Sequence, residues 1–391
     1  MIDMWWKKRT YFDYAAGASA NPSSPHEEGR CAKQMLEDAR LGIARLLEVQ
    51  SDDVIFTSGA TEANALAILG ILKKGDHALY LPSAHASIVE NMKLASERGV
   101  DVEPLPIKDF SVDCDKLEKM LRSETKMVSI DAVCGETGVV WNTREVASTL
   151  AKARSVESKN ASARAARPIQ HAFSNSPSRA FLHVDASQAP MTEKITRAHF
   201  SADLLTLDAS KVGAVRGIGA LVAHRTIPIT PLYRGGGQER GLRSGSEAPE
   251  LARSFARALT DAATCRESFR ASAEEMRALL VAKITATIPN VYINEGRSQA
   301  PHILNLSLPT RDTDYLVALL DEAGFAVSTR SACETDSEDG SRAVLALTGD
   351  QERARATLRV SWGHGVRPRE LEHFAKALAE TVLFVDKNNQ R

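Results

Sequence analysis

The sequence predicts an α/β fold, in which a mostly parallel sheet carries helices on both faces and a smaller α+β unit follows. Short apolar runs alternate with longer helical patterns between residues 27 and 211, and this alternation is typical of parallel sheets. Beyond residue 300, strands and helices follow in a mixed order, which predicts a second compact unit. Two of the apolar runs end in polar side chains, at the edge where α/β sheets gather their ligand-binding groups.

The first unit opens with a turn-rich segment at residues 21–26 and a helical pattern over Glu27–Leu47. A short strand at 53–57 then leads through a Ser-Gly turn into a helix that begins near Ala60. Further strands are expected at 78–81, 127–133, 181–185 and 204–208. Further helices are expected over 87–97 and from Glu145 onward.

Residues 152–180 interrupt this alternation. The stretch is rich in alanine and serine, carries six basic residues against the single acid Glu157, and has no clean apolar period. It predicts a mobile surface insertion that no core holds in place. A docking arm for an acidic partner is the alternative interpretation.

The second unit follows a long helical pattern at 250–263 that continues toward residue 288. Its expected strands are 302–308, 325–328 and 357–362, and its expected helices are 314–323 and 369–384. We therefore predict a large domain at residues 15–250 and a small domain at 1–14 and 251–391. The small domain carries a polar loop at 328–343.

Composition excludes several classes of protein. The 391 residues are 43% apolar with a net charge of -1, so the chain is neither disordered nor a nucleic-acid binder over its whole surface. The five cysteines are odd in number, widely spaced and never fall as CxxC, which predicts a reducing cytoplasm and no metal site. Since no run of roughly 18 apolar residues occurs, we expect a soluble protein with no membrane partner.

Lys211 and Asp185 are the two strand-end residues with the most suggestive chemistry. Lys211 follows the apolar run 204–207, and Asp185 ends the run 181–184. A lysine that can form a Schiff base and an aspartate that can pair with a pyridinium nitrogen are the minimal protein contribution to pyridoxal phosphate chemistry. The alternative for Lys211 alone is a solvated charge at a strand end.

Three further positions carry weaker signals. The turn before Ala60 and Thr61 exposes N–H groups that could bind a phosphate, although an ordinary capped helix explains it as well. His85, at a strand-to-helix junction, could lie over a planar cofactor or be merely solvated. Cys333 lies in a loop flanked by charges, which favours a reactive thiol.

Ten pieces of the sequence carry a resemblance to a known family: Lys211 and residues 11–16, 21–26, 56–64, 135–138, 183–188, 217–221, 235–245, 331–333 and 358–363. In this order along nearly the whole chain, they resemble the cysteine desulfurases of the class V aminotransferase group. The long loop after Cys333 resembles the group of these enzymes that has an extended, mobile cysteine loop.

The resemblance implies a fold type I pyridoxal phosphate enzyme with a seven-stranded type of sheet, acting as a homodimer. Such an enzyme converts L-cysteine to L-alanine. Lys211 would form the Schiff base with the cofactor and move protons at the substrate carbon. Asp185 would keep the pyridine nitrogen protonated, Gln188 would hydrogen-bond the ring oxygen, and His85 would stack on the ring.

The resemblance also assigns the remaining site residues. The cofactor phosphate would lie at Ala60 and Thr61, beside Ser210 and joined by Ser246 of the partner subunit. Arg359, with help from Asn21, would bind the substrate carboxylate. Cys333 would take up the sulfur as a persulfide and carry it to an acceptor protein.

Several positions depart from the family pattern. Cys134 and Gly135 replace an asparagine pair, Arg330 replaces a glycine, and residues 213–215 replace a tyrosine-glycine-proline. Asp208 and Ser210 replace a serine and a histidine. An aspartate next to a phosphate is repulsive unless it is paired or points away.

These departures leave other functions open. One alternative is a selenocysteine lyase or another class V lyase or aminotransferase, and a second is a weakly active or non-catalytic scaffold. The sulfur acceptor could belong to iron–sulfur cluster assembly or to tRNA thiolation, without direct binding of nucleic acid by this chain.

Overall fold

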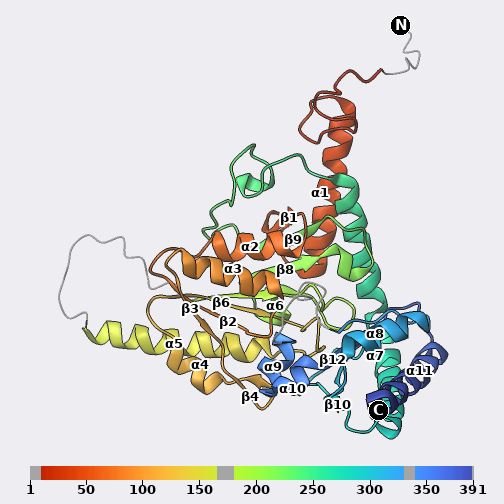
Figure 1. Cartoon of the computed structure of the whole chain (residues 1–391). Helices are drawn as coiled ribbons and strands as arrows, with labels where there is room; N and C mark the ends of the chain where they lie inside the picture. The colour runs from red at the N-terminus through yellow and green to blue at the C-terminus, as the bar shows by residue number, and fades with distance from the viewer. Residues whose placement is uncertain (1–9, 165–179, 330–339, 390–391) are drawn as a thin grey trace.

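The computed structural model describes residues 10–164, 180–329 and 340–389 (Figure 1). Cys333, Arg330 and most of the predicted loop 328–343 lie outside the described residues. So do residues 1–9 and the later part of the predicted insertion.

The large sheet confirms the predicted mostly parallel α/β architecture. Its strand order is β1-β9-β8-β7-β6-β2-β3, and only β9 runs antiparallel to its neighbours. The strands are β1 (Val54–Thr57), β2 (His77–Tyr80), β3 (Asp101–Pro104), β6 (Thr125–Asp131), β7 (Phe181–Asp185), β8 (Leu204–Asp208) and β9 (Gly219–Ala223). The parallel order brings the carboxyl ends of β6, β7 and β8 to one edge.

Helices cover both faces of this sheet (Figure 1). On one face lie α2 (Ala60–Leu69) and α3 (Ala86–Glu97), and on the other lie α4 (Cys114–Met120) and α5 (Thr143–Arg164). The short elements between them are α6 (Arg197–Phe200), β4 (Ile107–Lys108), β5 (Ser111–Val112) and the 3₁₀ turns η1 (Ser51–Asp53), η2 (Ala209–Val212) and η3 (Glu239–Gly241).

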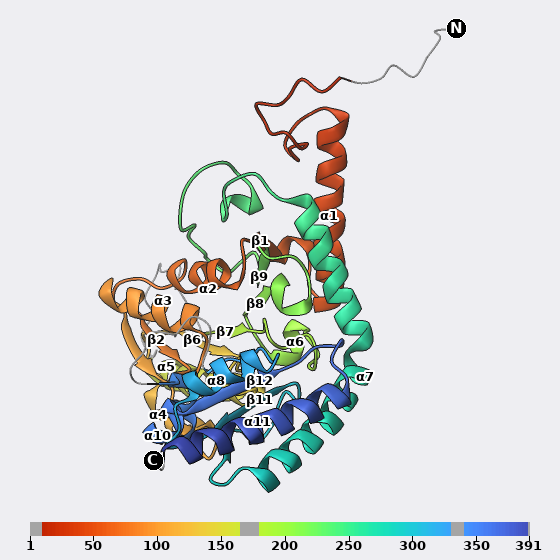
Figure 2. The ribbon, with the colours of Figure 1, turned by 45° about the vertical axis from the view of Figure 1, so that its right-hand side comes forward.

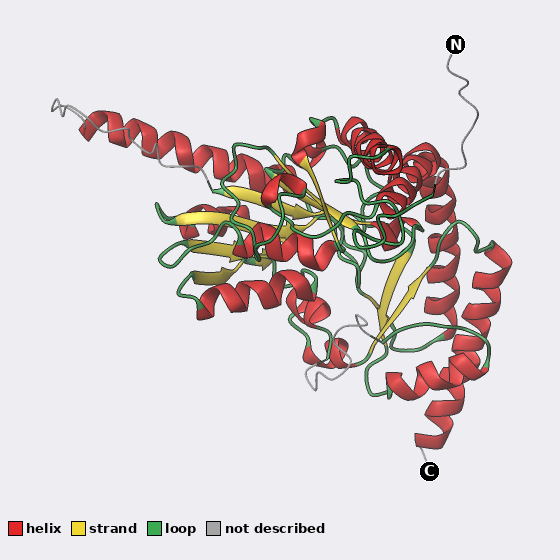
Figure 3. Cartoon of the chain, turned by 90° about the horizontal axis from the view of Figure 1, so that it is seen from above, coloured by secondary structure: helices red, strands yellow, loops and turns green. Residues whose placement is uncertain are grey.

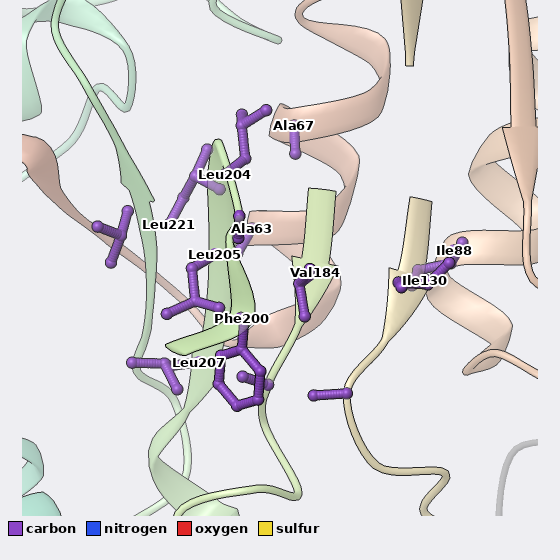
Figure 4. Close-up of a cluster of buried hydrophobic side chains, with 14 of the residues drawn as sticks. Ala63, Ala67, Ile88, Ile130, Val184, Phe200, Leu204, Leu205, Leu207 and Leu221 are labelled. Atoms are coloured by element: carbon purple, nitrogen blue, oxygen red, sulfur yellow. The ribbon is translucent and has the colours of Figure 1, made fainter. Parts of the chain in front are cut away.

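The core under α2 fixes the position of the later site. Leu204, Leu205 and Leu207 of β8 are fully buried, because the strand is covered on both faces. Ala63 and Ala67 of α2 lie against this layer (Figure 4), and their small side chains let the helix come close to the sheet. The N-terminus of α2 is thereby held near the end of β8.

Two long helices pack together beside this core, and the later one leads into the second unit. The helix α1 (Glu27–Leu47) has the predicted bounds and begins at His26, whose ring accepts the Gly29 N–H. It packs along α7 (Pro249–Thr287), which runs down the side of the molecule (Figures 1 and 2).

The second unit has its own apolar core around a three-stranded antiparallel sheet. Seen from above, this sheet lies apart from the large one (Figure 3). The elements are β10 (Tyr292–Ile293), β11 (Ile303–Ser307), β12 (Thr357–Ser361), α8 (Thr313–Glu322), α9 (Arg342–Thr348), α10 (Gln351–Arg355) and α11 (Pro368–Asn389). The exact domain boundaries stay a prediction.

Two local predictions were wrong. Residues 325–328 form no strand, since Ser328 alone pairs with Arg359 at the sheet edge. The insertion predicted from residue 152 begins as helix, because α5 continues to Arg164 and projects from the body (Figures 1 and 3). Alanine, lysine, arginine and glutamate favour helix, and glycine and proline are absent from this part. None of the helices in the described ranges is long and apolar enough to cross a bilayer.

Candidate active site

Lys211 lies on the wall of a cleft between the two units. It belongs to the turn η2, directly after β8, and its side chain is exposed. A cavity of about 610 Å³ and a smaller one of about 110 Å³ are both lined by four of the same residues, namely Lys211, Gln188, Gly135 and Arg359. His85 lines the smaller cavity. The structure therefore brings five predicted site residues to one cleft, namely Lys211, Gln188, Arg359, Ser210 and His85.

Asp185 is buried at the end of β7 and lines neither of the two cavities. The Ser187 N–H donates to its Oδ1 at 2.9 Å, and the Asn64 amide donates to its Oδ2 at 2.7 Å. The two donors fix the orientation of the carboxylate. Asn64 was given no role from the sequence, although a fully buried asparagine in the apolar helix α2 is a signal of a polar partner.

A chain of hydrogen bonds connects Asp185 with His85. The Asn64 amide also donates to Ser87 Oγ at 2.8 Å, and this hydroxyl lies 2.8 Å from His85 Nδ1. The Ser87 N–H donates to the same Nδ1 at 3.2 Å, so Nδ1 is an acceptor and the ring proton belongs on Nε2. The orientation of the His85 ring is therefore tied to the anchor of Asp185.

Burial favours the neutral form of two other titratable groups in the cleft. Burial, and next the neighbouring carboxylate of Asp185, raise the pKa of Asp131 to about 8. Burial raises the pKa of the Cys134 thiol to about 12, so this cysteine is not a nucleophile at neutral pH. Both residues line the smaller cavity.

Asp208 points at the start of α2. Its Oδ2 accepts the Ala60 N–H at 2.9 Å, and its Oδ1 accepts the Ser210 N–H at 2.8 Å and the Ser210 hydroxyl at 2.6 Å. A Cβ added at Gly59 would lie 3.2 Å from the same carboxylate. The aspartate is thus paired and does not point away from the predicted phosphate position, while Thr61 stays exposed.

Arg359 and Gly135 contact each other in the cleft. The Arg359 guanidinium donates to the Gly135 carbonyl oxygen at 3.2 Å. A Cβ at Gly135 would lie 2.9 Å from the Gln188 amide nitrogen, so the present position of Gln188 requires glycine there. The asparagine usual at this position would displace Gln188.

Asn21 and Ser246 lie together but away from Lys211 of the same chain. Their side chains are 3.4 Å apart, and neither lines the two cavities around Lys211. Ser246 belongs to the segment between β9 and α7, which rises from the sheet (Figure 1). Arg243 ties this segment to Glu62 of α2 at 3.3 Å.

Comparison with known proteins shows the family of this chain. Residues 9–158 and 165–374 match the class-V aminotransferase family. The mitosomal cysteine desulfurase of Encephalitozoon cuniculi is 32% identical over 375 residues, covering 93% of this chain and 80% of that protein. The cysteine desulfurase IscS 1 of Archaeoglobus fulgidus is 28% identical, covering 93% and 89%.

Solved structures show the same likeness. A NifS-like protein superposes with a TM-score of 0.81 at 26% identity, over 95% of this chain and 93% of that one. The chain belongs to the class-V aminotransferase family and, within it, to the cysteine desulfurases.

Proposed function

We propose that this chain is a pyridoxal phosphate-dependent cysteine desulfurase, which converts L-cysteine to L-alanine and transfers the sulfur to Cys333. The observation that carries the proposal is the meeting of Lys211, Gln188 and Arg359 in one cleft, with Asp185 anchored by Asn64 and Ser187. The similarity to cysteine desulfurases over 93% of this chain supports it.

The ring end of the cleft fits the cofactor. The Asp185 carboxylate, held by Asn64 and Ser187, can accept a hydrogen bond from a pyridinium N–H and so keep that nitrogen protonated. His85 lines the smaller cavity with its Nδ1 already bonded, so its ring can cover the face of the cofactor. The phosphate end does not fit as it stands, because Asp208 takes up the donors of Ala60 and Ser210.

When bound, pyridoxal phosphate supplies an aldehyde that reacts with amines and a ring that withdraws electrons from the substrate's α-carbon. The chain's own residues supply the remaining functions. The Lys211 amine holds the aldehyde end and moves the proton at the α-carbon. The forked guanidinium of Arg359 binds the carboxylate of L-cysteine and fixes its orientation.

Cys333 is proposed as the sulfur carrier. Its thiolate would form a bond with the sulfur of the substrate while the carbon–sulfur bond breaks, leaving a persulfide on the protein and alanine after proton uptake. The support is its place in the matching segment 331–333, since Cys333 lies outside the described residues. An acceptor protein would then take the sulfur from the persulfide.

Assembly and location are part of the proposal. A homodimer is supported by Ser246, which lies away from its own chain's Lys211 and would instead complete the partner's site. A reducing compartment such as the cytoplasm fits the cysteine pattern.

Purified protein incubated with cofactor, L-cysteine and a reductant should release alanine and sulfide in equal amounts. A Cys333→Ala variant should lose sulfur transfer to an acceptor, whereas Cys265→Ala, which changes an exposed cysteine on the rim of the same cavity, should retain it. Full transfer by the Cys333→Ala variant would contradict the carrier role. Faster turnover of selenocysteine would favour a lyase, and a protein that takes up no cofactor would favour a scaffold.

A further inference from the structure

The N-terminus of α2 already holds an anion that belongs to the chain. The first N–H groups of a helix have no partner within the helix, and the helix dipole has its positive end there. An anion at this place accepts hydrogen bonds from these N–H groups and is stabilised by the dipole. Here the Asp208 carboxylate accepts the Ala60 N–H at 2.9 Å, and Ser210 donates through both its N–H and its hydroxyl. Both oxygens of the carboxylate are therefore engaged.

These contacts are built into the local fold. Asp208 ends β8 and caps the turn η2, so its backbone is fixed by the sheet on one side and by Lys211's turn on the other. Gly59, with φ of 152°, turns the chain so that the Ala60 N–H meets the carboxylate. Thr57 and Ala60 are buried, which keeps the start of α2 in this place.

We propose that the Asp208 carboxylate occupies the anion site at the start of α2, so that this helix end does not take the phosphate of a cofactor. The chain would then select a pyridoxal-type cofactor by its ring and aldehyde, and the phosphate would add little affinity. Because the cofactor itself belongs to the proposed function, that second part rests on it. The occupied anion site does not.

The negative charge of Asp208 and its use of the Ala60 N–H both disfavour the binding of a phosphate at the start of α2. A phosphate placed at Ala60 must either stand beside the carboxylate, where the charges repel, or displace it from its donors. Serine at position 208 would remove the charge and free the Ala60 N–H for an external anion. Asp208→Ser is therefore the variant that opens the site.

The first experiment uses inorganic phosphate as the probe. Thermal unfolding is followed with and without phosphate, against potassium chloride at the same ionic strength. Phosphate should raise the Tm of the Asp208→Ser variant by about 3 °C or more and should leave the Tm of the wild type unchanged. The matched control is Asp261→Ser, which removes an exposed carboxylate that lines the cavity of about 610 Å³ next to Lys211 and should behave as wild type.

An equal phosphate response of wild type and Asp208→Ser would overturn the occupied anion site. If the serine variant does not fold, Asp208→Asn removes the charge and keeps the shape, and the same comparison applies. Neither outcome depends on whether the protein is a desulfurase.

The second experiment titrates wild type and variant with pyridoxal phosphate and with pyridoxal, followed by visible absorbance. In the wild type the two dissociation constants should agree within about threefold, and in Asp208→Ser the phosphorylated compound should bind at least about tenfold more tightly than pyridoxal. If the wild type bound pyridoxal phosphate about a hundredfold more tightly than pyridoxal, and the variant showed the same ratio, the inference would be overturned. If no protein binds either compound while the phosphate result holds, the proposed function fails and the occupied anion site stands.

Discussion

Asp185, the proposed partner of the cofactor ring, and Asp208, at the predicted phosphate position, make the same pattern of hydrogen bonds but use different donors of α2. Asp185 ends β7 and Asp208 ends the adjacent strand β8. In each, Oδ1 accepts the N–H two residues further on, and Oδ2 accepts a donor from α2. Asp185 uses the side chain of Asn64, whereas Asp208 uses the backbone of the helix start.

This difference separates chemistry from cofactor affinity. The donor for Asp185 is a side chain, so the helix end remains uninvolved and the carboxylate can serve a ring nitrogen. The donor for Asp208 is the N–H that an anionic ligand would need. Of the two aspartates, Asp208 alone thus occupies the backbone donor at the start of α2, and Asp185 leaves it unused.

The largest expected effect is at Lys211, which stands between the two ends. Lys211→Ala should lower the rate of alanine formation by at least about a thousandfold, because under the proposed function the amine would hold the cofactor and move the substrate proton. The measurement is alanine released from L-cysteine. Lys194→Ala, which removes an exposed lysine paired with Glu48, is the control and should keep full activity.

The next effect compares the two carboxylates directly. Asp185→Asn should lower kcat by about a hundredfold at saturating cofactor, since the ring nitrogen loses its charged partner. Asp208→Asn should change kcat by less than about threefold, because that carboxylate meets no reacting atom. Equal losses in the two variants would show that the two ends are not separate.

A smaller effect is expected at the substrate end. Arg359→Lys should raise KM for L-cysteine by about tenfold and change kcat less, because lysine cannot form the forked pair with a carboxylate. Steady-state kinetics separate the two constants. A pure kcat loss would instead give Arg359 a role in the chemical step.

The last prediction concerns stability and not activity. The pKa of Asp131 is raised from 3.8 to about 8, so its contribution to stability is full below about pH 4 and is lost as the pH rises toward 8. Asp131→Asn removes this loss, so the unfolding free energy of the variant relative to the wild type should rise by up to about 5 kcal/mol between pH 4 and pH 8. Urea unfolding at the two pH values measures the difference, and parallel curves for wild type and variant would contradict it.

The sequence was sufficient where local signals decide the structure. The bounds of α1 follow from its cap and its periodicity, and Lys211 and Asp185 follow from strands that end in polar residues. The parallel order of β7 and β8 then requires those ends to meet at one edge.

Other features depend on packing that no local pattern contains. The role of Asn64 requires that α2 lie on β7, and the direction of Asp208 depends on where the start of α2 is held. Residues 325–328 have strand composition but reach the sheet at Ser328 alone. The helix continues beyond Lys152 to Arg164 without an apolar period, and its residue types favour helix by propensity.

The most direct test is a crystal structure of the protein grown with pyridoxal phosphate. The predicted result is that Asp208 Oδ2 remains within about 3 Å of the Ala60 nitrogen, as in the 2.9 Å contact described above, while the cofactor ring lies against Asp185. A phosphate group bound to the Ala60 N–H, with Asp208 turned away, would contradict the account.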